Sequence, residues 1–340
     1  MIGNIVLIVP NFFAVAEEMR SQLVDEGYSV KLIYDRPFTS PIYHALAKYF
    51  PSLVEKLTEP YYIKQLDTIS TIDSLIVING QTVSAKIYDR INLKFPYCKK
   101  YLYMWDSTEN RPTALKYRDF FDDIFSFDPK SCFDFDLKFL PLFFFRKPRK
   151  VGSEKSLGNK IIAVTSHHAD RHKIIMDIAE RHKTKVYMHL FLKSALQYFF
   201  LKRVTGELRD AKKEDFKFFP LTTNTIDKLT HADDVILDIH HPAQTGLTLR
   251  SIEALGMGMK LATTNSSVSK YKVYNEKNIH ILDRCNPDIP ECFINRKADT
   301  KHNTKSADQL EFKVWIRVIL GELPYDVSNY TDFDLNCLFK

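Results

Sequence analysis

Short apolar runs alternate with helical patterns in two successive series, and this restricts the possible folds of the chain more than any other feature. The runs are continuous rather than alternating, so each predicted strand should be buried on both faces. Strands of this kind belong to parallel sheets that carry helices on both sides. The first series predicts strands at residues 4–10, 28–35, 74–80, 99–106 and 122–128, with a helix over about 14–26.

The alternation starts again at residue 160 and predicts a second unit of the same kind. Its predicted strands are residues 160–166, 185–190, 216–220, 234–241, 259–264 and 278–282. Its predicted helices are residues 169–182, 193–204, 224–230, 246–256 and 305–323. Between the two series, residues 145–160 are basic and then rich in Gly and Ser, which is typical of a linker.

We therefore predict an α/β fold class with two Rossmann-like, doubly wound domains that face each other across a cleft. The predicted boundaries are 1–147 for the N-terminal domain, 148–159 for the linker and 160–304 for the C-terminal domain. Residues 305–340 would form a C-terminal helix and tail that pack back on the N-terminal domain. Such sheets bind ligands at the carboxyl ends of their strands.

The bulk composition predicts a cytoplasmic protein of two domains. The chain has 340 residues, of which 45% are apolar and 26% charged. No apolar run reaches the roughly 18–20 residues that cross a bilayer, and the first residues lack the features of a signal peptide. The five cysteines are odd in number and have no metal-ligand spacing, which is typical of a reducing compartment.

The charge pattern indicates no nucleic-acid partner, because the net charge of +6 is spread over 48 basic and 42 acidic residues. Basic groups at residues 146–150 and 201–204 would suit anionic lipid headgroups, so peripheral contact with the inner face of the membrane stays open. Solvated linker and helix ends are the alternative. Aromatic runs at 101–106, 120–128, 133–145 and 196–200 favour a buried core, with a surface for a lipid-linked partner as the alternative.

The stretch "HPAQTGLTLRSIEALGMGMK", residues 241–260, holds three of the ten glycines in the chain. It follows a predicted strand, and we expect a helix to begin near Gly246 with Thr245 as its cap. A glycine there would let an anion approach the free N–H groups of the first turn, where the helix dipole favours negative charge. Gly256 would end the helix.

Gly246, Arg250 and Glu253 are spaced by four and three residues, so they would share one face of this helix. Helical side chains lean toward the N-terminus, so Glu253 would reach back beside an anion bound at Gly246. A carboxylate at that place suits the two hydroxyls of a ribose next to a pyrophosphate. A surface helix with two solvated charges is the alternative.

Other polar residues follow the strands of the same predicted sheet. Arg171 would clamp phosphate oxygens with its planar guanidinium, with Asp170 as a cap or as its orienting partner, and Lys193 would act as a point charge. Five histidines should converge at this edge: His167, His168, His172, His240 and His241. Their spacing lacks a zinc pattern, so we predict no metal and expect His168 and His241 to bind phosphate.

Three segments resemble a known family: residues 234–265, "YLYMWDS" at 101–107 and "FSFDPKSCFDFDLKFLPLFF" at 125–144. They are similar to bacterial GT-B glycosyltransferases of lipopolysaccharide and capsule assembly. The resemblance implies a GT-B-like fold, with Glu253 on the ribose and Thr245 and Gly246 facing the phosphates, and Gln244 in the same loop. It also implies catalysis without a metal or cofactor. Retaining members carry a second glutamate eight residues before the first; Thr245 stands there, so the stereochemical outcome stays open.

An inverting transfer needs a base that deprotonates the acceptor hydroxyl. We place it in the N-terminal domain and name Asp106, which ends a predicted strand, with Glu109, Asp35 and Asp128 as rivals. A turn-capping role for Asp106 is the alternative. The sequence thus predicts a glycosyltransferase that uses a nucleotide-diphosphate sugar and a bacterial, lipid-linked glycan acceptor. A nucleotide-sugar epimerase and a non-catalytic nucleotide-sugar-binding protein are the alternatives.

Overall fold

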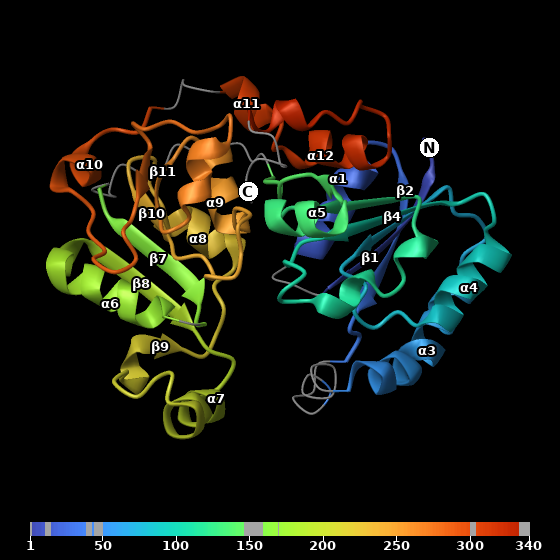
Figure 1. Cartoon of the computed structure of the whole chain (residues 1–340), viewed down its shortest axis with the longest axis horizontal. Helices are drawn as coiled ribbons and strands as arrows, with labels where there is room; N and C mark the ends of the chain where they lie inside the picture. The colour runs from blue at the N-terminus through green and yellow to red at the C-terminus, as the bar shows by residue number, and fades with distance from the viewer. Residues whose placement is uncertain are drawn as a thin grey trace. The chain divides into compact units, whose positions relative to one another are not determined.

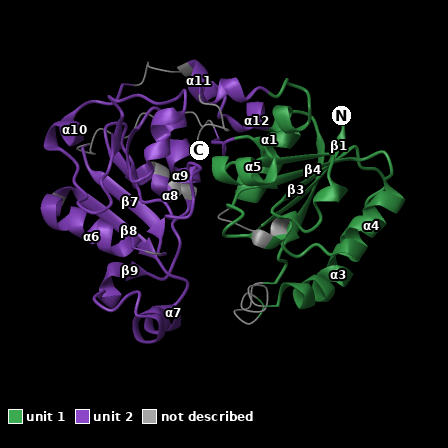
Figure 2. Cartoon of the chain, viewed as in Figure 1, with its two compact units in different colours: residues 1–140, 316–325, 338–340 green, residues 141–315, 326–337 purple. Residues whose placement is uncertain are grey.

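The computed structural model describes residues 2–10, 15–38, 43, 50–145, 159–168, 170–299 and 304–332. The chain forms two compact units (Figure 2). Unit 1 comprises Met1–Leu140, Ile316–Tyr325 and Leu338–Lys340, and unit 2 comprises Pro141–Trp315 and Asp326–Cys337. The basic group at 146–150 and the predicted linker, except Asn159, lie outside the described residues.

Unit 1 is built on a six-stranded parallel sheet in the order β2-β1-β3-β4-β5-β6 (Figure 1). Its strands are β1 Asn4–Pro10, β2 Ser29–Asp35, β3 Ser74–Ile78, β4 Lys99–Met104, β5 Asp123–Ser126 and β6 Lys138–Phe139. The predicted strands of the first series are confirmed, and β6 is additional. The order reverses direction between β1 and β3, which is the switch point of this sheet.

The helices of unit 1 are α1 Val15–Asp25, α3 Pro51–Asp67, α4 Ala85–Lys94 and α5 Pro129–Phe135. One core cluster joins buried apolar side chains of β1 and β3, such as Ile8 and Val77, to those of α3 and α4, such as Tyr62 and Ile87. The continuous apolar strands are therefore buried as their sequence predicts.

Unit 2 carries a second six-stranded parallel sheet, in the order β12-β11-β10-β7-β8-β9. Its strands are β7 Ile161–Ser166, β8 Val186–Phe191, β9 Phe216–Lys217, β10 Val235–Asp238, β11 Lys260–Thr263 and β12 Ile279–Ile281. Counted in chain order, this is the 3-2-1-4-5-6 arrangement of a Rossmann sheet, whose direction reverses between β7 and β10. The predicted fold class, α/β with two Rossmann-like domains, is confirmed.

The helices of unit 2 are α6 Arg171–His182, α7 Ala195–Phe200, α8 Thr223–Leu229, α9 Leu249–Gly256, α10 Glu291–Asn295 and α11 Thr304–Asp308. A π-helical turn, Leu201–Thr205, continues α7. The core of this unit joins strand residues such as Ala163 and Leu237 to Ile174 and Ile178 of α6.

Among the described residues, no helix is long and apolar enough to span a membrane.

The predicted single helix over 305–323 is wrong, because the structure breaks it into α11 and α12, Phe312–Ile319. Between these helices, Glu311 forms a parallel β-bridge with Phe144. The amide of Phe144 donates to the carbonyl of Leu310 at 2.9 Å, and the amide of Phe312 donates to the carbonyl of Phe144 at 2.9 Å. This long-range pairing takes up backbone groups that a continuous helix would need, and the local apolar spacing does not encode it.

Candidate functional site

At the switch point of the second sheet, the segments that follow β7 and β10 lie close together. The segments that follow the neighbouring strands lie at the same edge. Because the strands are parallel, their carboxyl ends all lie at one edge of the sheet. His167 and His168 follow β7, Lys193 follows β8, and residues 239–246 follow β10. The opening between the first and fourth strands of a Rossmann sheet is where ligands bind, so this edge is the candidate site.

Arg171, at the first position of α6, lies buried at this edge and ties its two central strands together. Its Nε donates to the carbonyl of Ile239 at 2.7 Å, and its Nη1 donates to the Thr165 hydroxyl at 2.6 Å and the Ser166 carbonyl at 2.7 Å. Burial lowers the pKa of the guanidinium, and nearby Asp238 partly offsets this effect. Arg171 therefore links the end of β7 to the residue after β10, and its positive charge lies at the switch point.

A second arginine, which the sequence analysis did not single out, lies at the same edge. Arg284 follows β12, and its Nη1 donates to Oδ1 of Asp170 at 2.6 Å. Its Nη2 donates to the carbonyl of His240 and lies 3.3 Å from the Thr264 hydroxyl. Asp170 therefore orients Arg284 rather than Arg171. Only the strand order, which brings the end of β12 near the end of β10, would have revealed Arg284.

Two partly buried histidines at the switch point, His168 and His240, have lowered pKa values. Burial, together with the charges of Arg171 and Arg284, lowers the pKa of His168 to about 3 and that of His240 to about 4. The ring centroids of His168 and His241 lie 5.3 Å apart. Nδ1 of His168 is buried without a hydrogen-bond partner among the described residues. A polar atom of that kind ordinarily has a partner, so a ligand is a natural one.

The five histidines do not gather into a metal site. Nε2 of His172 pairs with Asp215 at 3.0 Å, and its ring stacks on Phe216. Nδ1 of His240 lies 2.7 Å from the Thr264 hydroxyl. Within the described ranges there is no group of three or more His, Cys, Asp or Glu side chains that could hold a metal ion.

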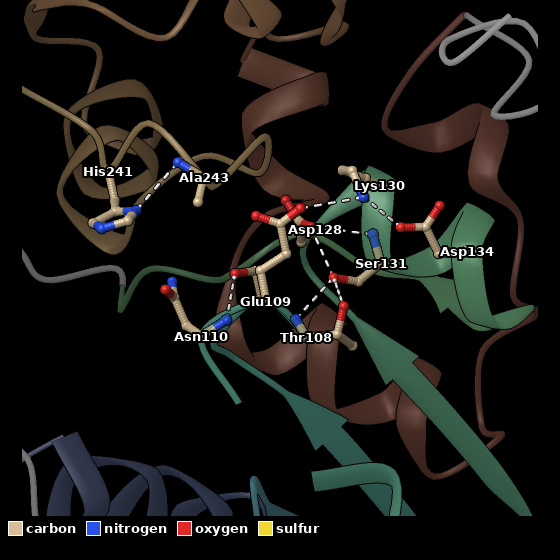
Figure 3. A network of polar contacts seen from close by, with 10 residues as sticks. Thr108, Glu109, Asn110, Asp128, Lys130, Ser131, Asp134, His241 and Ala243 are labelled. Atoms are coloured by element: carbon tan, nitrogen blue, oxygen red, sulfur yellow. Dashed lines mark hydrogen bonds and ion pairs between the residues drawn. The ribbon is translucent and has the colours of Figure 1, made fainter. Parts of the chain in front are cut away.

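Residues 244–246 form a loop that is held by amide side chains. Nε2 of Gln244 donates to the carbonyl of Gly246 at 3.0 Å. Nδ2 of Asn265, which follows β11, donates to the carbonyls of Thr245 and Gly246, both at 3.1 Å. Nδ1 of His241 accepts from the amide of Ala243 at 3.2 Å (Figure 3). The carbonyls of Thr245 and Gly246 therefore accept hydrogen bonds from side-chain amides, one of which follows β11.

The predicted start of the following helix is wrong by three residues: α9 begins at Leu249, and its cap is Thr248 rather than Thr245. The Thr248 hydroxyl accepts from the amide of Ser251 at 3.1 Å. The hydroxyls of Thr248 and Ser251 both donate to Oδ2 of buried Asp238, each at 2.7 Å. Asp238 ends β10, so a carboxylate inside the core fixes where the helix begins, and Gly246 lies in the loop before it.

Arg250 and Glu253 share a face of α9 and form an ion pair, with 3.0 Å between Nη1 and Oε2. Both side chains are about one-quarter exposed, at 28% and 27%. Arg250 therefore orients the carboxylate that the sequence analysis assigns to the ribose. Gly246 lies before the helix, so the predicted face common to Gly246, Arg250 and Glu253 reduces to this pair.

The other glycines of the stretch serve packing and chain reversal. α9 ends at Gly256, as predicted, and a Cβ atom on Gly256 would lie 2.3 Å from a ring carbon of Phe144. Gly258 has a φ of 65°, in the left-handed region where glycine is favoured.

Lys193 is exposed at the end of β8, where its amide donates to Oε1 of Gln197 at 2.9 Å.

In unit 1, Asp106 lies just beyond the carboxyl end of β4, where its side chain is 38% exposed. Nδ2 of Asn79 donates to its Oδ2 at 2.9 Å, and Nε of Arg111 donates to the same atom at 3.3 Å. Asn79 follows β3 with a φ of 61°, and its Oδ1 accepts from the amide of Trp105 at 3.0 Å. Asp106 is thus a half-exposed carboxylate held by two donors.

Two of the three rival carboxylates of unit 1, Asp35 and Asp128, are buried and hydrogen-bonded within the fold. Asp35 is fully buried and accepts from the amides of Gln81 and Thr82 at 2.8 and 3.0 Å. Asp128 caps α5 and accepts from the amide and the hydroxyl of Ser131. Figure 3 shows the third rival, Glu109, paired with Lys130 at 3.3 Å.

No protein-family profile matches the chain, and no curated protein matches it. Solved structures match it over most of its length. MnaA of S. aureus with UDP is 9% identical, with a TM-score of 0.44, and covers 94% of this chain and 91% of its own. MurG of Acinetobacter baumannii is 12% identical, with a TM-score of 0.39, and covers 94% and 95%. At these values we draw no functional conclusion from the matches, and the site is interpreted from its own residues.

Proposed function

We propose that the protein is a glycosyltransferase that binds a nucleotide-diphosphate sugar at the switch point of unit 2. The observation that carries the proposal is His168, a neutral histidine just after β7 whose buried Nδ1 has no hydrogen-bond partner in the described part of the chain. A neutral imidazole can donate one hydrogen bond to a phosphate oxygen. Arg171 and Arg284 lie at the same edge of the sheet, and the N-terminal end of the α9 dipole adds to the positive potential.

The same residues would supply the chemistry of the donor. In the transfer, the bond between the anomeric carbon and the phosphate oxygen breaks, and negative charge develops on the departing nucleoside diphosphate. The charges of Arg171 and Arg284 and the dipole of α9 would stabilise that charge without a metal ion. Glu253, oriented by Arg250, would accept hydrogen bonds from the ribose hydroxyls. Gln244, Thr245, Gly246, His241 and Lys193 complete the proposed donor site.

We assign the acceptor side to unit 1. The acceptor would be a growing bacterial surface glycan of the lipopolysaccharide or capsule type, on a lipid anchor. In an inverting reaction its hydroxyl oxygen bonds to the anomeric carbon while the proton passes to a base. We propose Asp106 as that base, since Asp35 and Asp128 already accept hydrogen bonds from Thr82 and Ser131.

The first test is a thermal-shift series with UDP, GDP, dTDP, CMP, ADP and their common sugars, on the native chain and on Glu253→Ala. A ligand at about 100 times its Kd adds roughly 2.7 kcal/mol of stability. One diphosphate should stabilise the native chain strongly and Glu253→Ala much less. Arg250→Ala is the matched control, because it breaks the same ion pair and leaves the carboxylate in place.

Turnover distinguishes the transferase from the alternatives. A transferase should release nucleoside diphosphate only when a glycan acceptor is added, and release should persist in EDTA. An epimerase would convert the donor sugar with no acceptor present, whereas a binding protein would show a thermal shift and no turnover. If no nucleotide stabilises the native chain, or if Glu253→Ala responds as the native chain does, the donor site proposed here is wrong.

A further inference from the structure

A surface of unit 2 that shares only Lys193 with the proposed donor site combines exposed apolar side chains with cations. α7 and the π-helical turn after it expose Leu196 by 80% and Val204 by 68%, and Phe199 and Phe200 by 50% and 54%. The spacings of three, four and eight residues from Leu196 place all four on one side of a helix. We name these four residues the apolar stripe.

The other side of the same segment is firmly attached to the core. Tyr198 is buried, its hydroxyl donates to the carbonyl of Ala211 at 2.9 Å, and its ring packs 5.7 Å from that of Phe216 in β9. Nζ of Lys202 donates to the same Ala211 carbonyl at 2.7 Å. Figure 1 shows α7 beside β9, at the end of the second sheet. The apolar stripe is therefore held outward by a well-packed base.

Within residues 193–205, which carry the stripe, every charged side chain is a cation. Lys193 precedes α7 and Arg203 lies within the π-helical turn, and both are exposed. Lys217 is also exposed, and it pairs in register with Phe191, two residues before Lys193. From Lys193 to Thr205 the chain has no acidic residue; the next one, Glu207, follows the reversal at Gly206, where φ is 75°.

We propose that this surface docks on a bilayer that contains anionic lipid. Cations near the surface of such a bilayer gain attraction to the headgroups, while Leu, Phe and Val side chains enter the boundary with the acyl chains. A second copy of the chain would instead bring cations against cations, which opposes pairing of two stripes. The proposal does not depend on the proposed function, because its readout is vesicle binding rather than turnover.

The test is flotation of the full chain with vesicles of phosphatidylcholine alone and with about 30 mol% phosphatidylglycerol. We expect binding to the anionic vesicles only, weakened at about 0.5 M salt because the Debye length shortens. Leu196→Gln/Phe200→Gln should lower the bound fraction by about tenfold, and Arg203→Glu should lower it as well. Leu93→Gln/Tyr97→Gln, at side chains 85% and 95% exposed in unit 1, is the matched control and should bind as the native chain does.

Each other outcome overturns the proposal. Two such outcomes are flotation of the native chain with neither kind of vesicle and flotation of the stripe variant to the same extent as the native chain. An equal loss in the control variant would show non-specific binding. A native dimer in light scattering that Leu196→Gln/Phe200→Gln converts to a monomer would assign the stripe to a second copy. If the double variant does not show a cooperative unfolding transition near the native Tm, it is not folded as the native chain is. The flotation of Phe199→Gln and of Arg203→Glu then tests the proposal.

Discussion

Three histidines near the switch point of unit 2 are buried in their neutral form, and this makes the stability of the protein depend on pH. Burial is the main cause that lowers the pKa of His167 and His240 to about 4 and that of His168 to about 3. An unfolded histidine titrates near 6.5, so between about pH 4 and 6.5 the unfolded chain binds more protons than the folded chain. The stability these residues contribute is therefore present above pH 6.5 and is lost as the pH falls.

Each of these histidines contributes a slope of at most about 1.4 kcal/mol per pH unit within that window. We expect His168→Gln to flatten the fall in the free energy of unfolding between pH 7 and pH 5, measured by urea titration. His172→Gln serves as the comparison, since His172 pairs with Asp215. If His168→Gln and the native chain lose the same stability, His168 is not held neutral.

Asp106 is predicted to act on the acceptor and not on the donor. Asp106→Asn keeps the side chain's size and should lower the rate of transfer by about 10²–10⁴-fold, the usual contribution of a general base. The thermal shift given by the nucleotide should stay unchanged. Glu109→Gln, which breaks only the ion pair with Lys130, should leave the rate within about twofold of the native value. A large loss in Glu109→Gln with a normal Asp106→Asn would exchange the two assignments.

At the scale of elements, α9 is positioned by contacts at both of its ends. Asp238 anchors its first turn, and the Phe144 ring lies against Gly256 at its last. Gly256→Ala would bring a methyl group within 2.3 Å of that ring, so the ring or the helix must shift. We expect Gly256→Ala to lower the free energy of unfolding by about 1–3 kcal/mol, the usual cost of overpacking.

Adding Phe144→Leu to Gly256→Ala tests whether the Phe144 ring causes the loss of stability. The double variant should recover part of the loss, so that the two changes are not additive in a double-mutant cycle. Additive losses would mean that Gly256 is needed for its backbone rather than for the Phe144 ring. Alanine has the higher helix propensity, so a stabilised Gly256→Ala would contradict the contact outright.

The same elements show what a sequence can and cannot reveal. The apolar strands and the second series of α/β units follow from local periodicity, and the structure has them within a few residues. The start of α9 does not follow from local periodicity, since it depends on hydrogen bonds to Asp238. Gly246 lies in the loop before α9, and Asn265, which follows the next strand, donates to its carbonyl. Arg284 and the Phe144–Glu311 bridge were missed for the same reason: their partners are distant in the chain.

At the scale of the whole molecule, the chain contains two parallel sheets, and each has its own switch point. That of unit 1 lies between β1 and β3, and that of unit 2 lies between β7 and β10. Either could in principle receive a nucleotide. In unit 1 the end of β3 is occupied by its own residues, since Gln81 and Thr82 donate to Asp35 and Asn79 bonds to β4. In unit 2 the corresponding edge has the buried Arg171, the partly exposed Arg284 and a buried nitrogen of His168 with no hydrogen-bond partner among the described residues.

Hydrogen exchange measured by mass spectrometry distinguishes a nucleotide bound at the switch point of unit 1 from one bound at the switch point of unit 2. With the nucleoside diphosphate that stabilises the chain, the segments 165–172, 239–250 and 264–266 should exchange more slowly, because ligand contacts suppress local opening. Segment 79–84 in unit 1 should exchange at its unliganded rate. In Glu253→Ala the protection of unit 2 should disappear at the same ligand concentration. Protection confined to 79–84 would move the nucleotide to the first sheet, and the two units would then exchange their proposed roles.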